Sequence, residues 1–257
     1  SVIMKLEQTI AIVTGSSSGV GAATARQIAA AGGKVVVNYV SKDQAAELVA
    51  EECRALGGEA VVCKGDVSDD AACQQLVQTA TEHFGGLNCL INNAGTTKFN
   101  AHEHLAGLTD DDFYRIYGVN VVGPYQMVRA AESALRTAKE SVVVNVASIA
   151  GVRGVGSSIA YAASKGALIT MTQSLARVMG PEVRVNAVCP GFIEGDWLAE
   201  GMGQEVYDRS LASLRERTPL QTVCTPETVA DSIVGFITAH GVVTGQHLVL
   251  DGGHLLI

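Results

Sequence analysis

Short apolar runs alternate along the chain with longer segments in which apolar residues recur at helical spacing. The short runs are rich in Val, Ile and Leu and are continuous rather than alternating, as is typical of strands that are buried on both faces of a sheet. They predict seven strands, at Thr9–Thr14, Lys34–Tyr39, Glu59–Lys64, Asn88–Ile91, Ser141–Ala147, Val183–Val188 and His247–Leu250.

The longer segments are rich in Ala, Leu, Gln and Glu, and they predict helices at Val20–Ala31, Lys42–Leu56, Asp69–Phe84, Asp110–Thr137 and Ile159–Met179. The second of these is expected to begin after Ser41 and to end at Gly57-Gly58. Strands that alternate with helices are typical of repeated β-α-β units, so the chain is predicted to be an α/β protein with a parallel sheet. Residues 1–257 contain no linker, repeat or low-complexity segment, which predicts a single domain.

The segment from residue 192 to 218 interrupts this alternation. It contains Gly195, Gly201, Gly203 and the only tryptophan, Trp197, and it has a polar, helix-like part around Glu205–Arg217. Long irregular insertions are usually functional or mobile. We expect a substrate loop that closes as a lid over the site; the alternative is a structural arm that packs on a neighbouring subunit.

The composition limits the possible partners. Hydrophobic residues make up 47% of the chain and charged residues 17%, which is enough for a large core with helices on both faces of a sheet. The formal net charge is −8 and Lys and Arg are not clustered, so a nucleic-acid partner is not expected. The sequence has no apolar run of eighteen residues, and Ser1–Gln8 has no hydrophobic signal core, so neither membrane insertion nor export is predicted. Small molecules are the expected partners.

Six cysteines are present but form no C-x-x-C pair. We interpret them as small buried residues of a protein in a reducing compartment, which favours the cytoplasm. His102 and His104 flank Glu103, but no third ligand is apparent, so no metal site is predicted.

A glycine-rich turn joins the first predicted strand to the first predicted helix. Thr14-Gly15 ends the strand, and Gly19-Val20-Gly21 begins the helix. Glycines allow the backbone to approach a bound group closely, and the helix N-terminus offers unpaired N–H donors to a diphosphate. This turn is therefore predicted to bind a nucleotide.

Tyr161 and Lys165 lie about one helical turn apart on one face of a predicted helix. The cation favours the phenolate, so the tyrosine is expected to exchange protons with a substrate. Ser148 precedes Tyr161 by thirteen residues, and Asn92-Asn93-Ala94-Gly95 follows the fourth predicted strand. Together with the glycine-rich turn, these residues resemble the short-chain dehydrogenase/reductase family from about Thr9 to Gly253.

The resemblance implies a Rossmann-type, doubly wound sheet and an oxidoreductase that interconverts a carbonyl and a secondary alcohol. Tyr161 would be the general acid and base, with its pKa lowered by Lys165 and by the oxidised cofactor. Lys165 would also bind the nicotinamide ribose. Ser148 would hold the substrate oxygen, although a serine in this place also suits a turn or helix cap. Asn120 would kink the long helix and order water beside the lysine.

The resemblance also implies a cofactor site along the carboxyl edge of the sheet, where Asp66-Val67 would contact the adenine and the segment after the sixth strand would line the nicotinamide. A turn or helix-entry role is the alternative for Asp66. Glu194 stands where many relatives have a threonine that binds the carboxamide. The predicted cofactor residues are Gly15, Ser17, Ser18, Gly19, Val20, Asn38, Tyr39, Asp66, Val67, Asn93, Ala94, Gly95, Tyr161, Lys165, Pro190, Gly191 and Ile193.

The end of the second strand favours NADP(H) over NAD(H). It lacks the acid that would bind a ribose 2′-hydroxyl and repel a 2′-phosphate. Ser17, Asn38, Ser41 and Lys42 are the candidate donors. Relatives that prefer the phosphorylated cofactor often have Arg or Lys where this chain has Ser18 and Tyr39.

Within the family, the chain is similar to 3-oxoacyl-acyl-carrier-protein reductases and to sugar or polyol dehydrogenases. An acidic carrier protein would need a basic landing patch, to which Arg129, Arg136, Lys139 and Arg177 could contribute. A non-catalytic nicotinamide-binding sensor or scaffold is the alternative of another class. Family members mostly form tetramers or dimers through the long helices and the last strand, so a homo-oligomer is expected.

Overall fold

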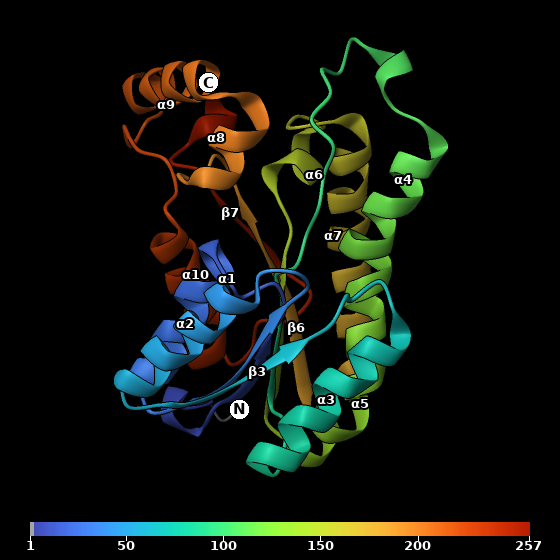
Figure 1. Cartoon of the computed structure of the whole chain (residues 1–257), viewed down its shortest axis with the longest axis vertical. Coiled ribbons are helices and arrows are strands. Elements are labelled where there is room, and N and C mark those ends of the chain that lie inside the picture. Colours follow the sequence, from blue (N-terminus) through green and yellow to red (C-terminus); the bar gives the residue numbers. More distant parts are fainter. Residues whose placement is uncertain (1–2) are drawn as a thin grey trace.

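The computed structural model describes residues 3–257. Its centre is a single sheet with helices packed around it (Figure 1). The sheet has seven parallel strands in the order β3-β2-β1-β4-β5-β6-β7. The predicted strands are confirmed, with bounds that shift by at most two residues. The strands are β1 (Ile10–Val13), β2 (Lys34–Tyr39), β3 (Glu59–Lys64), β4 (Cys89–Asn92), β5 (Ser141–Val146), β6 (Val183–Pro190) and β7 (His247–Leu250).

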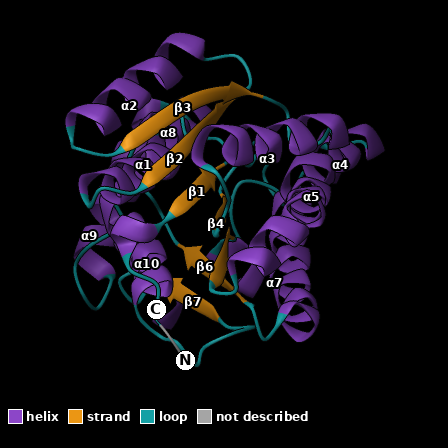
Figure 2. Ribbon diagram, turned by 90° about the horizontal axis from the view of Figure 1, so that it is seen from below, coloured by secondary structure: helices purple, strands orange, loops and turns teal. Residues whose placement is uncertain are grey.

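Helices cover both faces of the sheet, so the predicted doubly wound architecture is confirmed (Figure 2). On one side lie α1, α2 and α10, and on the other lie α3, α5 and α7. The helices are α1 (Gly19–Ala30), α2 (Asp43–Ala55), α3 (Asp70–Phe84), α4 (Asp110–Tyr117), α5 (Gly123–Ala138), α6 (Ile149–Arg153), α7 (Ile159–Met179), α8 (Asp196–Met202), α9 (Gln204–Arg217) and α10 (Pro226–Thr238).

The strands are buried because successive side chains enter different cores. Ala11 and Val13 pack beneath α1, α2 and α10, whereas Ile12 packs beneath α3 and α5. Every residue of β5 is buried. A sheet covered on both faces therefore requires apolar residues at consecutive positions, which is the pattern that the sequence shows.

The helix predictions are correct for α1, α3 and α7 and need three corrections. The cap of α2 is Lys42 rather than Ser41, and no side-chain cap bond is made there within the described residues. The predicted helix Asp110–Thr137 is divided by a π-helical turn, η3 (Gly118–Val122). The short helices α6 and α8 and the longer α10 were not predicted, although Thr225 and Thr228 form a capping box at the start of α10.

The sheet reverses its strand order between β1 and β4, because the chain leaves β1 toward β2 and leaves β4 toward β5. Ligands of open α/β sheets bind at the carboxyl ends of the strands beside such a switch point. The segments after β1, β4, β5 and β6 meet there, with α8 and α9 beside this edge (Figure 1). Within residues 3–257, no helix has both the length and the apolar character that a membrane span requires.

Candidate active site

The glycine-rich turn after β1 has the shape that its sequence predicts. Gly15 and Gly19 have φ angles of +60° and +57°, a region that favours glycine. A Cβ on Gly21 would lie 2.6 Å from Asn93 Nδ2, so a side chain at this position is excluded. Ser18 caps α1 without a side-chain bond among the described residues, which leaves N–H groups of the first turn for a ligand. The turn therefore fits a nucleotide diphosphate.

Asn93 and Ala94 brace this turn from β4. The Asn93 amide donates to the backbone carbonyls of Thr14 and Gly15, each at 3.0 Å, and the Ala94 N–H donates to Thr14 Oγ1 at 3.0 Å. The Asn93 side chain is thus committed to the protein interior, and Gly95 is the exposed residue of the segment.

The structure corrects the predicted role of Asn38 as a hydrogen-bond donor to the cofactor. Its side chain is only 1% exposed; its Oδ1 accepts from the Gly15 N–H at 2.9 Å, and its amide donates to the carbonyls of Cys63 and Gly65 at 3.2 and 3.0 Å. The Asn38 backbone groups both bond to Ser16. Asn38 is therefore not a free donor for a 2′-phosphate: it joins the glycine-rich turn to β3. Ser17, Ser41 and Lys42 remain partly or fully exposed.

Asp66 takes the turn role that was the alternative to a contact with the adenine. Its Oδ1 accepts from the Ser68 N–H at 2.9 Å and from the Ser68 hydroxyl at 2.7 Å. The neighbouring Val67 is buried, and its carbonyl accepts from Gln126 Nε2 at 2.8 Å. Both residues follow β3 at the carboxyl edge, where Asp66 is exposed.

Tyr161 and Lys165 come together on α7. The Lys165 ammonium lies 5.6 Å from the centroid of the Tyr161 ring and donates to the carbonyl of Val146 at 2.7 Å. Burial lowers the pKa of Lys165 to about 8. Burial also raises the pKa of Tyr161 to about 12, and a hydrogen bond with the Ser148 side chain acts in the opposite direction.

The expected lowering of the Tyr161 pKa by Lys165 is therefore wrong for the protein alone. Burial raises the free energy of the charged phenolate by more than the surrounding side chains lower it. Lys165 is itself almost fully buried, and its protonated form is disfavoured for the same reason. The phenol thus stays protonated through neutral pH, and this is the form that can donate a proton.

Ser148 is a helix cap whose hydroxyl also lies beside Tyr161. It follows β5 and caps α6, where its Oγ accepts from the Ala150 N–H at 3.0 Å. A serine hydroxyl that accepts in this way keeps its own hydrogen for a second partner. The Ser148 side chain also forms a hydrogen bond with the Tyr161 phenol and lowers its pKa. The capping role therefore keeps the Ser148 hydroxyl beside Tyr161.

Asn120 lies in the π-helical turn η3, so the predicted disruption of the long helix at this residue is confirmed. Its Oδ1 accepts from the Thr96 N–H at 2.8 Å, and its amide donates to the Thr96 carbonyl at 2.9 Å and to Ser164 Oγ at 3.0 Å. A Cβ on Gly95 would lie 3.5 Å from both Asn120 Oδ1 and Lys165 Nζ. The absence of a side chain on Gly95 thus leaves a gap that both polar atoms border.

The segment after β6 follows the edge of the same crevice. Pro190 ends β6, the Gly191 N–H donates to the Leu250 carbonyl at 2.7 Å, and Ile193 forms an isolated parallel bridge with Cys224. The Glu194 carboxylate pairs with the Arg215 guanidinium on α9. The residue that replaces the threonine of many relatives therefore attaches this segment to α9.

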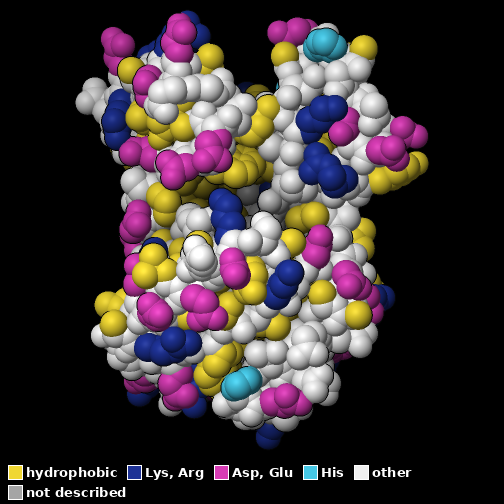
Figure 3. Space-filling model, viewed as in Figure 1, with side chains coloured by type: hydrophobic (Ala, Val, Ile, Leu, Met, Phe, Trp, Pro, Cys, Tyr) yellow, Lys and Arg dark blue, Asp and Glu magenta, His cyan; other side chains and the backbone are white. Residues whose placement is uncertain are grey.

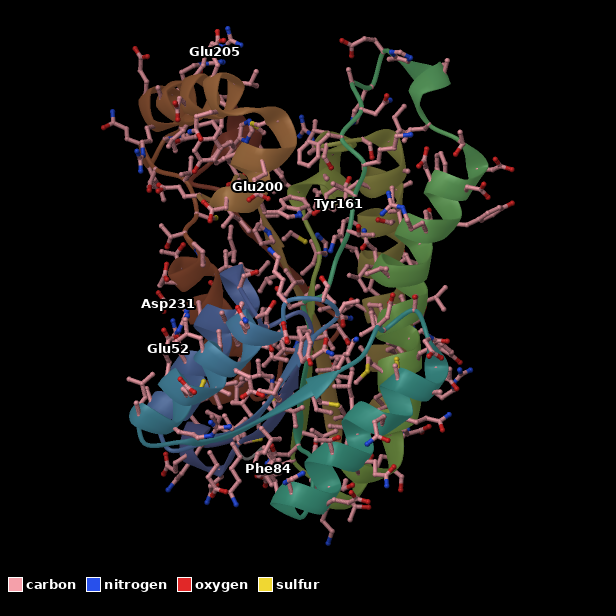
Figure 4. All side chains as sticks on the ribbon, in the orientation of Figure 1. Glu52, Phe84, Tyr161, Glu200, Glu205 and Asp231 are labelled. Atoms are coloured by element: carbon pink, nitrogen blue, oxygen red, sulfur yellow. The ribbon has the colours of Figure 1, made fainter. Side chains whose placement is uncertain are left out.

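Aromatic side chains meet over Tyr161. The Trp197 ring on α8 lies 6.3 Å from the Tyr161 ring and 5.6 Å from the Phe99 ring, measured between centroids. Tyr161 lies beside the space between α7 and α8 (Figure 4), and the space-filling view shows a hollow there with hydrophobic side chains on the α8 side (Figure 3). Phe99 lies in an irregular segment without a recognisable sequence pattern, so no signal in the sequence marks it as a site residue.

The four residues proposed as a basic landing patch do not form one at the crevice. Arg129 pairs with Asp70 at 2.8 Å, and Arg136 pairs with glutamates on both sides at 3.0 Å. Arg136 and Lys139 directly precede β5, and Arg177 precedes β6, so these three lie toward the amino edge of the parallel sheet. Ser148 and Tyr161 lie at the opposite, carboxyl edge.

The six cysteines are all buried and free, as expected. The His102 ring nitrogen Nε2 lies 3.1 Å from the Gly156 carbonyl, so this histidine fastens one loop to another. Within residues 3–257, no group of three or more His, Cys, Asp or Glu side chains has the arrangement to hold a metal ion.

Known proteins match this chain over almost its whole length. A family model described as enoyl-(acyl carrier protein) reductase matches residues 15–254. The "Granaticin polyketide synthase putative ketoacyl reductase 2" of Streptomyces violaceoruber is 42% identical over 97% of this chain and 98% of its own. A 3-oxoacyl-[acyl-carrier-protein] reductase of Synechocystis is 33% identical over 98% of each chain.

Solved structures show the same fold. A protein from Burkholderia xenovorans, described as a "putative short-chain dehydrogenase/reductase", superposes with a TM-score of 0.90 and 37% identity, over 97% of this chain and 99% of its own. An NAD⁺-bound xylitol dehydrogenase superposes with a TM-score of 0.86 and 26% identity, over 96% of this chain and 98% of its own. The chain belongs to the short-chain dehydrogenase/reductase family. It is an oxidoreductase of the class that interconverts carbonyls and alcohols with NAD(P)(H).

Proposed function

We propose that the protein reduces the carbonyl of a small molecule to a secondary alcohol, with Tyr161 as the proton donor. The observation that supports this most strongly is the meeting of Asn120, Ser148, Tyr161 and Lys165 at the sheet edge that also holds the glycine-rich turn. The dinucleotide, when bound, supplies the hydride. The side chains supply orientation and the proton.

Each polar group has one task in this proposal. Ser148 donates its hydroxyl hydrogen to the substrate oxygen, since the bond that its Oγ accepts from the Ala150 N–H leaves this hydrogen available. Tyr161 delivers its proton to the same oxygen. Lys165 then stabilises the phenolate that remains. The gap at Gly95, which is bordered by Asn120 and Lys165, gives a water the room to return the proton.

Reduction is the direction that this proposal favours near neutral pH. A phenol with its pKa raised to about 12 is almost fully protonated there, which suits an acid rather than a base. Oxidation of an alcohol would require the rare phenolate, and its rate should rise with pH.

We propose NADP(H) as the preferred cofactor. No carboxylate ends β2, and Ser17, Ser41 and Lys42 are exposed or partly exposed beside this end. Asn38 is not among these donors, because its side chain is buried and bonded to the backbone. The affinity ratio of NADPH to NADH, measured for the unchanged protein and for Lys42→Ala, tests it: the ratio should exceed one and should fall in the variant, whereas a ratio below one would reverse the assignment.

We propose a 3-oxoacyl thioester or a related oxo compound as substrate, in line with the names of the two relatives. A sugar or polyol, as in the name of the xylitol dehydrogenase, is the alternative. The aromatic side chains over Tyr161 favour the first, because a polyol needs converging hydrogen-bond partners.

The deciding experiment follows the absorbance of the reduced cofactor against oxoacyl thioesters, cyclic ketones, sugars and polyols with each nicotinamide form. Tyr161→Phe should abolish turnover and keep cofactor binding, while the matched control Tyr114→Phe, at a residue that is 71% exposed on α4, should change neither. A protein that binds cofactor but turns over nothing would instead be a sensor or scaffold.

Three further proposals concern the whole protein. Residues 1–257 form a single domain in which 192–218 is the substrate lid. A homo-oligomer is supported by the edge strand β7, where Leu248 is 44% exposed, and by Val242 and Leu256, which are 89% and 82% exposed. A monomer in sedimentation would contradict it. A cytoplasmic location is supported by six free cysteines.

A further inference from the structure

We infer that Trp197 and Phe99 select a planar, fused-ring carbonyl compound, and that the indole of Trp197 stacks on the ring system of the substrate. This inference rests on the proposed function, because it assumes that Tyr161 meets the substrate carbonyl. It names the substrate class of that site more narrowly than an oxo compound.

The two aromatic side chains form the wall nearest the reacting phenol. The indole of Trp197 is tilted by 45° to the Tyr161 ring at 6.3 Å and by 56° to the Phe99 ring at 5.6 Å. Trp197 is nevertheless 50% exposed, so a large part of its surface faces solvent. Aromatic rings gain most from offset or tilted contact with another ring. A flat substrate held at Tyr161 would cover this exposed surface.

Both sides of this wall are held in place. Phe99 belongs to a segment that is fastened to the loop before α7: the Asn100 N–H donates to the Ser157 carbonyl at 2.9 Å, and the Thr97 and Ser157 hydroxyls lie 2.7 Å apart. On the lid side, the Glu194–Arg215 pair fastens the segment that leads into α8. A preformed wall loses little entropy when it binds a rigid ring.

The lid helix fits closely around the Phe99 ring. A Cβ on Gly201, which is in α8 on the turn after Trp197, would lie 2.0 Å from the nearest ring carbon. Glycine therefore lets α8 approach the ring until Trp197 reaches Tyr161.

The charged groups beside the Phe99 segment are already engaged by other groups of the protein. Lys98 pairs with Asp112 at 2.7 Å, and Arg115 donates to Thr96 Oγ1 at 3.0 Å and to the Thr97 carbonyl at 3.3 Å. These bonds hold the Phe99 segment against α4 and leave its aromatic ring as the surface toward the lid. The chemistry that matches such a wall is a conjugated, ring-fused ketone.

The test compares 2-tetralone, a fused bicyclic ketone, with the acetoacetyl thioester of N-acetylcysteamine, a linear oxoacyl compound. Trp197→Ala should lower kcat/KM for 2-tetralone at least tenfold and for the linear thioester less than threefold. Trp197→Phe should recover most of the loss, and the control Leu48→Ala, at a position on α2 that is 55% exposed, should change neither. An equal loss for both compounds, or no loss for 2-tetralone, would overturn the inference.

A binding measurement keeps the inference separate from the proposed function. Trp197 is the only tryptophan, so intrinsic fluorescence reports on this one position. Addition of 2-tetralone to the protein with oxidised cofactor should quench the emission at saturation, and the linear thioester should not. If the unchanged protein reduces neither compound, the proposed function fails; if the emission also stays constant with 2-tetralone, the inference fails as well.

Discussion

Replacement of Asn38 by Ala should destabilise the protein and weaken both nicotinamide cofactors equally. The Asn38 amide satisfies three backbone groups, the Gly15 N–H and the carbonyls of Cys63 and Gly65. Alanine would leave these groups without their partner in a region where the side chain is 1% exposed. A buried polar group that loses its partner costs about 1–3 kcal/mol. Since water can reach the partly buried Gly15 N–H, we expect a total loss of about 3–5 kcal/mol.

Urea unfolding measures this loss as a lower midpoint with an unchanged m value. The dissociation constants of NADH and NADPH, taken below the unfolding range, should rise by a similar factor, because the glycine-rich turn loses its tie to β3. Ser41→Ala is the matched control for stability, since Ser41 is exposed, and its effect should stay within about 0.5 kcal/mol. If Asn38→Ala weakened only NADPH and left the stability unchanged, Asn38 would be a 2′-phosphate ligand and the structural role assigned to it would be wrong.

Three other changes have defined outcomes. Lys165→Met should raise the free energy of unfolding at pH 7 by about 1–3 kcal/mol, because the pKa of Lys165 is about 8 in the folded protein and about 10.4 in the unfolded chain. The gain should disappear as the pH rises from 8 toward about 10.4, and urea titrations at each pH would measure it. Gly201→Ala should push the lid from Phe99 and lower kcat/KM at least tenfold in cofactor-absorbance assays. Glu194→Gln should lower the free energy of unfolding by less than about 1 kcal/mol. It should also break the ion pair with Arg215 and speed proteolytic cleavage within α8 and α9.

Controls separate these effects from general damage. Gly235→Ala, in α10 with open space around the added methyl group, should stabilise rather than impair the protein. Glu52→Gln, which breaks an ion pair with Arg26 far along the chain from the lid, should leave proteolysis of α8 and α9 unchanged. A pH-independent effect of Lys165→Met, or full activity of Gly201→Ala, would contradict the reasoning for that residue.

The sequence predicts the sheet well because every β5 residue and nearly every β1 residue is buried, so the apolar runs directly reflect the fold. The spacing of Tyr161 and Lys165 likewise survives, since both lie on α7. Asn38 could not be assigned, because its partners lie 23 to 27 residues away and meet it only when β2 pairs with both β1 and β3.

The remaining misses also depend on packing across distant segments. Phe99 and Gly201 are distant in the sequence and meet only where α8 packs on the segment that follows β4. The direction of the Tyr161 pKa shift is set by burial, which the spacing of a phenol and an ammonium cannot reveal. By contrast, α10 could have been predicted: Thr225-Pro226 starts it, and its buried apolar residues recur at helical spacing.

The most direct test of the central claim is single-turnover hydride transfer from NADPH to a reducible ketone, measured by stopped flow for the unchanged protein and for Tyr161→Phe. The unchanged protein should transfer at a constant rate between pH 6 and 7 and more slowly above pH 8, as Lys165 loses its proton. Tyr161→Phe should be about 10²–10⁴-fold slower at every pH with an unchanged NADPH dissociation constant. Transfer by Tyr161→Phe within a factor of about two of the unchanged rate would contradict the assignment of Tyr161 as the proton donor.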